Sequence, residues 1–493
     1  MIKKIGYGVA AVLLLLIVVA FANMFFKNSL QPDIEPVAAL KVDVDSAALS
    51  LATAIRFRTI SSFEDASLND DQFRKLHDHL RQRYPLVHSR LKREVVNELS
   101  LIYVWPGSDT SLKPIALMAH QDVVPIAPGT EEKWESAPFS GEIKDGFVWG
   151  RGSWDDKGNL IAELEAVEML LQEGFQPRRT VYFIFGADEE VSGHRGAKSI
   201  AKILKDRGVQ FEYVLDEGLM ITEGIMAGID APMALIGIAE KGYLSLKLEA
   251  ETAPGHSSMP PPSPNESAIA QISQALVKLD NNPMPGGIQG VVAEMLSAMA
   301  PEMKGIKRFA MSNIWLLGPV IKKQLAGKAN TNAMLRTTTA LTIVNAGNKE
   351  NVLPGRAEAV VNFRLLPGDT DQSVIDYVQK TIANDQIKVS VTGSYSAPSK
   401  VSSTSSDAYL SIRRTVREVF PGTLVVPGLM VAATDSRYMD SIADNVFRFA
   451  PVRAKSDDLA RFHGTNERLS IENLGQMIGF YHRLLTVTAG DGK

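Results

Sequence analysis

Cysteine is missing from this 493-residue chain, and so is a surplus of charge of either sign. Without cysteine the chain can form no disulfide bond, no thiol nucleophile and no zinc site with sulfur ligands. The 52 Lys and Arg residues are nearly balanced by 56 Asp and Glu residues, so no basic field attracts nucleic acid and no nucleic-acid partner is expected. Any metal ion must be held by histidines and carboxylates.

The overall composition is that of an ordinary globular protein. Hydrophobic residues make up 45% of the chain, and the mean hydropathy of -0.01 is close to zero. A chain of this length can bury a large core, and we expect two or three domains.

The N-terminal segment does not have this globular composition. Two lysines precede residues 5–26, which are apolar except for Asn23. The run is long enough to span a bilayer and its lysines favour a cytoplasmic start, so we expect residues 1–27 to be a transmembrane anchor with the catalytic domain on the extracytoplasmic side. A signal peptide cleaved near residues 20–22, which would release a secreted protein, and a buried core helix are the alternatives. A linker, residues 28–43, follows.

Strand-like and helix-like segments alternate in the first part of the body. Short apolar runs are separated by segments in which apolar residues recur at helical spacing. In chain order these are strand 115–119, helix 160–171, strand 180–185, helix 196–206 and strand 211–215. This order predicts an α/β fold with a mixed, mostly parallel sheet covered by helices, and a catalytic domain whose first part is residues 44–231.

The alternation stops near residue 232. Residues 232–368 hold strands and helices in irregular order, which predicts an inserted α+β domain. Its strands are expected at 233–238, 244–250, 338–344 and 357–366. The second part of the catalytic domain, residues 369–493, is expected to carry helices near 373–384, 408–420 and 471–485.

Histidine and carboxylate side chains follow the predicted strands, at the edge where ligand sites of open α/β sheets gather. His120 follows the first strand, Glu189 and Glu190 follow the second, and Asp216 follows the third. Imidazole and carboxylate groups are ligands that zinc accepts. Two ions about 3.5 Å apart can share one carboxylate and activate a water, and two adjacent glutamates can then serve as a ligand and a general base.

A glycine-rich stretch, residues 149–158, carries Asp155 and Asp156 into the start of a predicted helix. An aspartate at this position is either a helix N-cap or a functional group. The other candidate ligands, which include His463 near the C-terminus, favour Asp155 as a bridge between two metal ions.

Six motifs together resemble the M20 family of co-catalytic zinc peptidases and deacylases, in the branch of carboxypeptidase S and the N-acyl amino acid hydrolases. They are residues 118–125 (MAHQDVVP), 150–158 (GRGSWDDKG), 188–193 (DEEVSG), 215–218 (LDEG), 255–258 (GHSS) and 462–464 (FHG). The resemblance covers about residues 45–488. It implies a fold of the zinc exopeptidase type whose inserted domain is a lid or dimerisation domain, and therefore a possible homodimer.

The resemblance also implies a set of metal ligands for two zinc ions, which cobalt or manganese can replace. The implied ligands are His120, Asp155, Glu190, Asp216 and His463. Glu217 is an alternative to Asp216, because relatives use either residue type. A cis peptide bond is expected between Asp155 and Asp156.

Further roles follow from the same resemblance. Glu189 would be the general base, and Asp122 would orient His120. His256 would polarise the scissile carbonyl, and in dimeric relatives it comes from the neighbouring subunit. Asn351 and Arg364 would grip the substrate carboxylate. Residues 434–437 (TDSR) are also family-like, and their role is open.

The implied activity is hydrolysis of an amide bond next to a free carboxylate, in a short peptide or an N-acyl amino acid. The residues do not separate a carboxypeptidase from an aminoacylase, although a lipid-like acyl group would suit an enzyme held at a membrane. One alternative is a catalytically inactive, membrane-anchored binding protein of the same fold, which is disfavoured because every implied ligand and the base are present. The other is a two-metal hydrolase of the arginase or phosphatase type.

Overall fold

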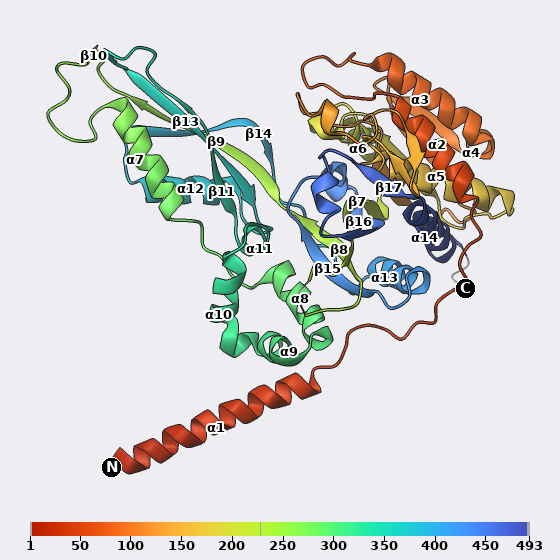
Figure 1. The fold of residues 1–493 in the computed structure, drawn as a ribbon, viewed down its shortest axis with the longest axis horizontal. Coiled ribbons are helices and arrows are strands. Elements are labelled where there is room, and N and C mark those ends of the chain that lie inside the picture. Colours follow the sequence, from red (N-terminus) through yellow and green to blue (C-terminus); the bar gives the residue numbers. More distant parts are fainter. Residues whose placement is uncertain (1, 227, 491–493) are drawn as a thin grey trace.

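An eight-stranded mixed sheet organises the larger part of the chain in this computed structural model, which describes residues 2–226 and 228–490 (Figure 1). Met1 and residues 491–493, which fall in the expected N-terminal segment and final domain part, lie outside the described residues. The strand order is β1-β2-β6-β3-β7-β16-β8-β15. The four central strands run parallel: β6 (Val181–Gly186), β3 (Ile115–His120), β7 (Phe211–Glu223) and β16 (Ala443–Lys455).

Antiparallel strands complete both sides of this sheet. They are β1 (Lys92–Val96) and β2 (Ser100–Trp105) on one side, and β8 (Met233–Glu240), which is antiparallel to β16, on the other. The edge strand β15 (Leu424–Met430) pairs in parallel with β8. The predicted mostly parallel α/β sheet is confirmed, with antiparallel strands at its margins.

Helices cover the two faces of the sheet because its strands are apolar on both. In β3, Leu117 belongs to one buried cluster and Met118 to another, since successive side chains point to opposite faces. The first face carries α2 (Val44–Arg56), α5 (Lys157–Gln172), α13 (Asp407–Val419) and α14 (Ile471–Ala489), and the second carries α6 (Ala197–Asp206). Two further helices, α3 (Asp70–Arg83) and α4 (Pro85–Arg90), extend the first face.

One strand is longer than the sequence predicts. The strand expected to end at residue 215 continues as β7 to Glu223. Its second half stays in the sheet because Ile221 pairs with Arg453 of β16 and with Ala234 of β8. Asp216, which was expected to follow the end of this strand, therefore lies within it.

A second, smaller sheet has the antiparallel order β11-β13-β9-β14, and we call it with its two helices the small unit. Alternate residues of β9, such as Leu246 and Leu248, are buried under the two helices. The elements are β9 (Gly242–Glu251), α7 (Ala268–Asn281), β11 (Thr338–Asn345), β13 (Arg356–Leu365), α12 (Asp371–Ile382) and β14 (Ile387–Ser396). A two-stranded tip, β10 (Gly255–His256) with β12 (Val352–Leu353), lies at its far end (Figure 1).

The membership of these elements differs from the expected boundaries of 232–368. Strand β8 lies in the large sheet, whereas α12 and β14 pack in the small unit. Hydrophobic periodicity identifies the apolar face of an element but not the sheet that the face covers.

The chain crosses between the two sheets at two adjacent places. Lys241 alone separates β8 from β9, and the chain returns after β14. The crossings are joined because Ser399 N donates to Glu240 O at 3.0 Å and Glu240 N donates to Ser399 Oγ at 2.8 Å. Gly242 permits the close approach, since a Cβ there would lie 2.6 Å from Ser396 O.

Four helices that follow α7 in the chain pack at the β15 edge of the large sheet. They are α8 (Gly290–Met299), α9 (Gly305–Ser312), α10 (Ile314–Ala326) and α11 (Ala329–Leu335). Helix α1 (Ile2–Phe26) projects away from the body beside α9 (Figure 1). Among the described residues its segment Lys4–Phe26 is long and apolar enough to cross a membrane, a test that a signal sequence also passes.

Candidate active site

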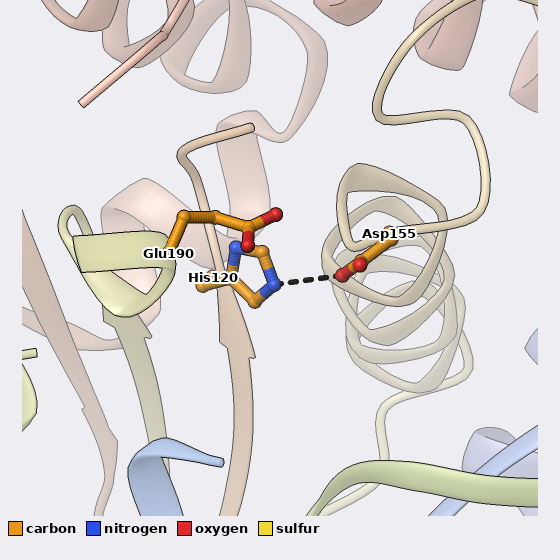
Figure 2. A group of neighbouring side chains, drawn as sticks. All are labelled: His120, Asp155 and Glu190. Carbon is orange, nitrogen blue, oxygen red and sulfur yellow. Dashed lines mark hydrogen bonds and ion pairs between the residues drawn. The ribbon is translucent and has the colours of Figure 1, made fainter. Parts of the chain in front are cut away.

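Asp155 lies between two histidines that are far apart in the sequence. His120 ends β3, and its Nε2 is 2.9 Å from Asp155 Oδ1; His463 Nε2 is 2.7 Å from Asp155 Oδ2. Figure 2 shows His120 and Asp155 facing each other, with Glu190 beside them. Asp155 is not the helix cap, since Asp156 precedes α5 in that position, and the peptide bond between the two aspartates is cis as expected.

A buried ion pair fixes the loop that carries Asp155. Arg151 Nη1 donates to Glu467 Oε2 at 2.6 Å, and both side chains are buried. The other carboxylate oxygen, Glu467 Oε1, accepts from the backbone N–H groups of Gly152, Trp154 and Asp155 at 2.9, 3.0 and 3.2 Å. Glu467 follows His463 closely, in the loop before β17 (Arg468–Ser470), which pairs with β5 (Phe147–Trp149) and through it with β4 (Glu142–Lys144).

Asp122 connects His120 with the two glutamates that follow β6. His120 Nδ1 lies 3.0 Å from Asp122 O and 3.3 Å from its Oδ1. The same carboxylate accepts from the backbone N–H of Glu189 at Oδ1 and of Glu190 at Oδ2, both at 3.1 Å. Asp122 is fully buried, so one side chain positions a histidine and two neighbouring glutamates.

Glu217 points into the cluster, and Asp216 points away from it. Glu217 Oε1 is 3.9 Å from His120 Nε2. Asp216 instead accepts from the backbone N–H of Ser436 at 2.7 Å and of Glu217 at 3.0 Å. Successive side chains of a strand point to opposite faces, so only one of the two can reach the histidine.

The charges of the cluster fit a cation. Burial, together with the neighbouring carboxylates, raises the pKa of Glu189 and of Glu217 well above the usual range. Hydrogen bonds to Asp155 and Glu190 raise the pKa of His463 to about 10. Glu190 Oε1 is buried, and His463 Nε2 lies 3.4 Å from it. An excess of buried carboxylates around two imidazoles is the environment that a divalent cation stabilises.

Three overlapping sets of side chains have ligand atoms close enough to hold a metal ion, with all atoms of a set within 4.8 Å of one another. The sets are His120 with Asp155 and Glu190, His120 with Glu189 and Glu217, and Asp155 with Asp156 and Glu217. Nitrogen and carboxylate donors in this combination suit zinc and similar ions.

A cavity of about 430 Å³ opens beside this cluster. Glu189, Glu190 and His463 line it together with the basic residues Lys241, Arg364 and Arg437. Arg364 lies over the ring of Tyr243 at 4.8 Å, which orients its guanidinium. The cavity therefore offers basic side chains suited to an anionic group and also borders the carboxylates of the cluster.

Two of the residues expected in the site lie elsewhere. His256 and Asn351 are exposed at the tip of the small unit, where Ser257 N donates to Asn351 O at 3.1 Å. Figure 1 places this tip, at β10, far from β7 and β16. Arg364, by contrast, lies on β13 near the crossing and lines the cavity.

Several residues of the site were missed from the sequence. Glu467 and Lys241 stand in no recognised motif, so no local pattern indicates their roles. Arg437 belongs to the segment 434–437, and the structure places its guanidinium in the cavity wall, where it also donates to Thr434 O and Ser192 O.

The structure combines a helix-covered α/β sheet, a cluster of candidate metal ligands at its strand ends and an inserted small unit. The chain belongs to peptidase family M20/M25/M40, whose model matches residues 116–487. The predicted family is thereby confirmed, and the chain is a member of an enzyme family of peptidases and related hydrolases.

Similar proteins include both branches that the motifs indicate. A probable carboxypeptidase S-like protein of Dictyostelium discoideum is 42% identical over 442 residues, which cover 89% of this chain and 84% of that protein. An N-fatty-acyl-amino acid synthase/hydrolase of Xenopus tropicalis is 40% identical over 439 residues, which cover 88% of this chain and 84% of that protein. The crystal structure of an M20 family metallo-carboxypeptidase from Sulfolobus solfataricus has the same fold, with a TM-score of 0.63, 18% identity and coverage of 89% and 98%.

Proposed function

We propose that this protein is a zinc-dependent hydrolase of amide bonds next to a free carboxylate, in short peptides or N-acyl amino acids. The observation that carries the proposal is Asp155, whose two carboxylate oxygens face His120 and His463 beside a cavity with cations in its wall. A shared carboxylate of this kind suits two metal ions, and the cations suit the carboxylate of the substrate.

Two zinc ions would be held by residues from five parts of the chain. We assign His120 and Glu217 to one ion, Glu190 and His463 to the other, and Asp155 to both. Glu217 takes the place expected for Asp216, because its carboxylate is the one directed at His120. Bound zinc, or cobalt or manganese in its place, supplies Lewis acidity that polarises a carbonyl and lowers the pKa of a water.

The chain's own residues would carry the protons and hold the substrate. Glu189 accepts a proton from the attacking water and passes it to the leaving amine. Its backbone is fixed by Asp122, which keeps the carboxylate at the cavity wall. Arg364 binds the substrate carboxylate through its paired N–H groups, next to Lys241 and Arg437.

A homodimer would complete the site. His256 Nδ1 accepts a hydrogen bond from Ser258 N at 3.1 Å, which leaves Nε2 as a donor suited to the scissile carbonyl. Because the tip is far from the cluster in the same chain, we propose that His256 and Asn351 serve a second copy. The exposed edge strand β11 supports this, since it carries Leu341, Ile343 and Val344 without a neighbour on its outer side among the described strands.

The N-terminal helix would anchor the enzyme to a membrane, with the body on the extracytoplasmic side. The length and composition of Lys4–Phe26 support this arrangement. Mass spectrometry of the protein purified from membranes tests it, because a chain that begins after residue 22 would show a cleaved signal peptide and a secreted enzyme.

An activity screen tests the proposed chemistry. Zinc-loaded protein is assayed on dipeptides and on N-acyl amino acids of rising chain length, each beside its carboxamide counterpart. We expect hydrolysis of free-carboxylate substrates, at least about 100-fold slower in Glu189→Gln with metal content unchanged. Full activity in that variant, or after removal of metal by a chelator, would contradict the proposal. Ligand binding without any hydrolysis would instead favour the inactive relative.

A further inference from the structure

A strongly basic segment lies beside the end of α1. Between residues 303 and 328 the chain contains no Asp or Glu but six cations, which are Lys304, Lys307, Arg308, Lys322, Lys323 and Lys328. The segment forms α9 and α10. Lys304 pairs with Asp230 at 2.7 Å, and the other five cations place positive charge on this part of the surface.

The last turns of α1 make specific contacts with this segment. Arg308 Nε donates to Met24 O at 3.1 Å, and Asn313 Nδ2 donates to Ala20 O at 2.9 Å. The rings of Phe21 and Phe309 are 5.1 Å apart. Ala20 lies about 9 Å from the end of the helix, at 1.5 Å per residue. If α1 crosses a bilayer, α9 and α10 lie at the depth of the headgroups, where interfacial helices are buried by about 5–10 Å.

Large apolar side chains project from the same two helices. Trp315, Leu316 and Val320 share one exposed face of α10, and Lys323 continues it one turn later. Ile306 is 78% exposed on α9. Exposed aromatic and aliphatic side chains next to lysines are the composition of a helix that lies in a membrane interface.

We propose that α9 and α10 form a membrane-binding surface that docks on an anionic bilayer beside α1. This goes beyond the proposed hydrolase activity and rests on α1 remaining attached as the anchor. The occupant is a bilayer because the surface is continuous with a membrane-spanning helix and its charge complements anionic headgroups. A second copy of this surface would bring two basic segments together, which repel each other. Docking would hold the body against the membrane at a fixed orientation.

Tryptophan fluorescence tests the proposal directly. Trp105, Trp134, Trp149 and Trp154 are buried, whereas Trp315 is 54% exposed. The full chain is reconstituted into vesicles of phosphatidylglycerol and brominated phosphatidylcholine, whose bromine quenches tryptophan within the bilayer. The contribution of Trp315 is the difference in emission between the wild-type chain and Trp315→Phe. We expect the brominated lipid to quench most of this contribution. Trp315 emission that brominated lipid leaves unchanged would overturn the proposal.

Two valines provide a matched pair of variants. Val320 on α10 is 66% exposed, and Val277 on α7, a helix of the small unit, is 58% exposed. Val320→Asp is expected to reduce quenching of Trp315 at least twofold, and Val277→Asp to leave it unchanged. Equal effects of both variants on the quenching of Trp315 would overturn the proposal. A mature chain that lacks α1 would overturn it too, as would crosslinking that shows Trp315 covered by a second copy of the chain. Hydrolysis of a water-soluble substrate, measured on each sample, reports separately on the proposed enzyme activity.

Discussion

Arg151 and Glu467 form a buried ion pair that joins the two loops carrying Asp155 and His463. Glu467 accepts from the backbone of the Asp155 loop, and Arg151 Nη2 donates to His463 O and Gly464 O, both at 3.1 Å. Residues more than 300 positions apart are thereby held in one geometry. Neither side chain needs to touch a metal ion to control where the ligands lie.

Replacing Glu467 by Gln should therefore weaken metal binding. The variant leaves Arg151 buried without its counter-charge, which we expect to lower the free energy of unfolding by about 3 kcal/mol and metal affinity by about 10–100-fold. Calorimetric titration with zinc and denaturant unfolding measure the two effects. The exposed pair of Arg207 with Glu94, 2.7 Å apart, is the control, since Glu94→Gln should cost less than about 1 kcal/mol and leave zinc affinity unchanged. Similar results for both variants would contradict the role given to Glu467.

Replacing Glu217 and replacing Asp216 should have different effects on zinc content. Glu217→Gln should lower the affinity for one zinc ion per chain, because it removes a charged ligand atom directed at His120. Asp216→Asn should keep both ions and lose about 1–3 kcal/mol of stability, because one acceptor of its buried hydrogen bonds is replaced by a donor. Metal analysis of the purified variants measures the difference. Normal zinc content in Glu217→Gln with loss in Asp216→Asn would reverse the assignment.

His256 should act on the site of a second copy. Glu189→Gln and His256→Ala are each expected to be nearly inactive, because each removes a group needed at the same site. Mixed after dissociation, they should recover about one quarter of wild-type activity, since random pairing makes half of the dimers mixed and each has one complete site. Activity assays with light scattering measure this. If a mixture shown to contain mixed dimers recovered no activity, the proposal that His256 serves the site of the second copy would be contradicted.

His77 should make stability depend on pH below neutrality. Burial lowers the pKa of His77 to about 4, and the neutral ring donates from Nε2 to Gln121 Oε1 at 2.7 Å. The unfolded chain takes up this proton near pH 6.5 and the folded chain does not, so stability should fall by about 3 kcal/mol between pH 6.5 and pH 4 and level off below. Denaturant unfolding of His77→Gln should lack this component. If the free energy of unfolding changed with pH in the same way in both proteins, His77 would not be the source of the pH dependence.

The sequence predicts the large sheet well because its central strands are uninterrupted apolar runs. Leu117 and Met118 are buried on opposite faces, and such runs occur where helices cover both sides of a parallel sheet. His120, Glu189 and Glu190 were located by the same logic, since each follows a strand end on the common edge. These features are local in the sequence.

Features that depend on distant segments could not be predicted in this way. Glu467 is one glutamate among many, and only the fold brings it to Arg151. The choice between Asp216 and Glu217 depends on which face of β7 meets His120, and the boundary of the small unit depends on which sheet covers α12. Each is decided by tertiary packing and not by residue type.

Rotation of the small unit about the paired crossings at Lys241 and Ser399 would displace its parts by unequal distances. Arg364 pairs with Tyr243, two residues from the crossing, so a rotation hardly displaces its guanidinium. His256 lies beyond the far end of β9, whose ten residues span about 33 Å. A rotation of about 10° would therefore move the tip by about 6 Å and leave Arg364 near the axis.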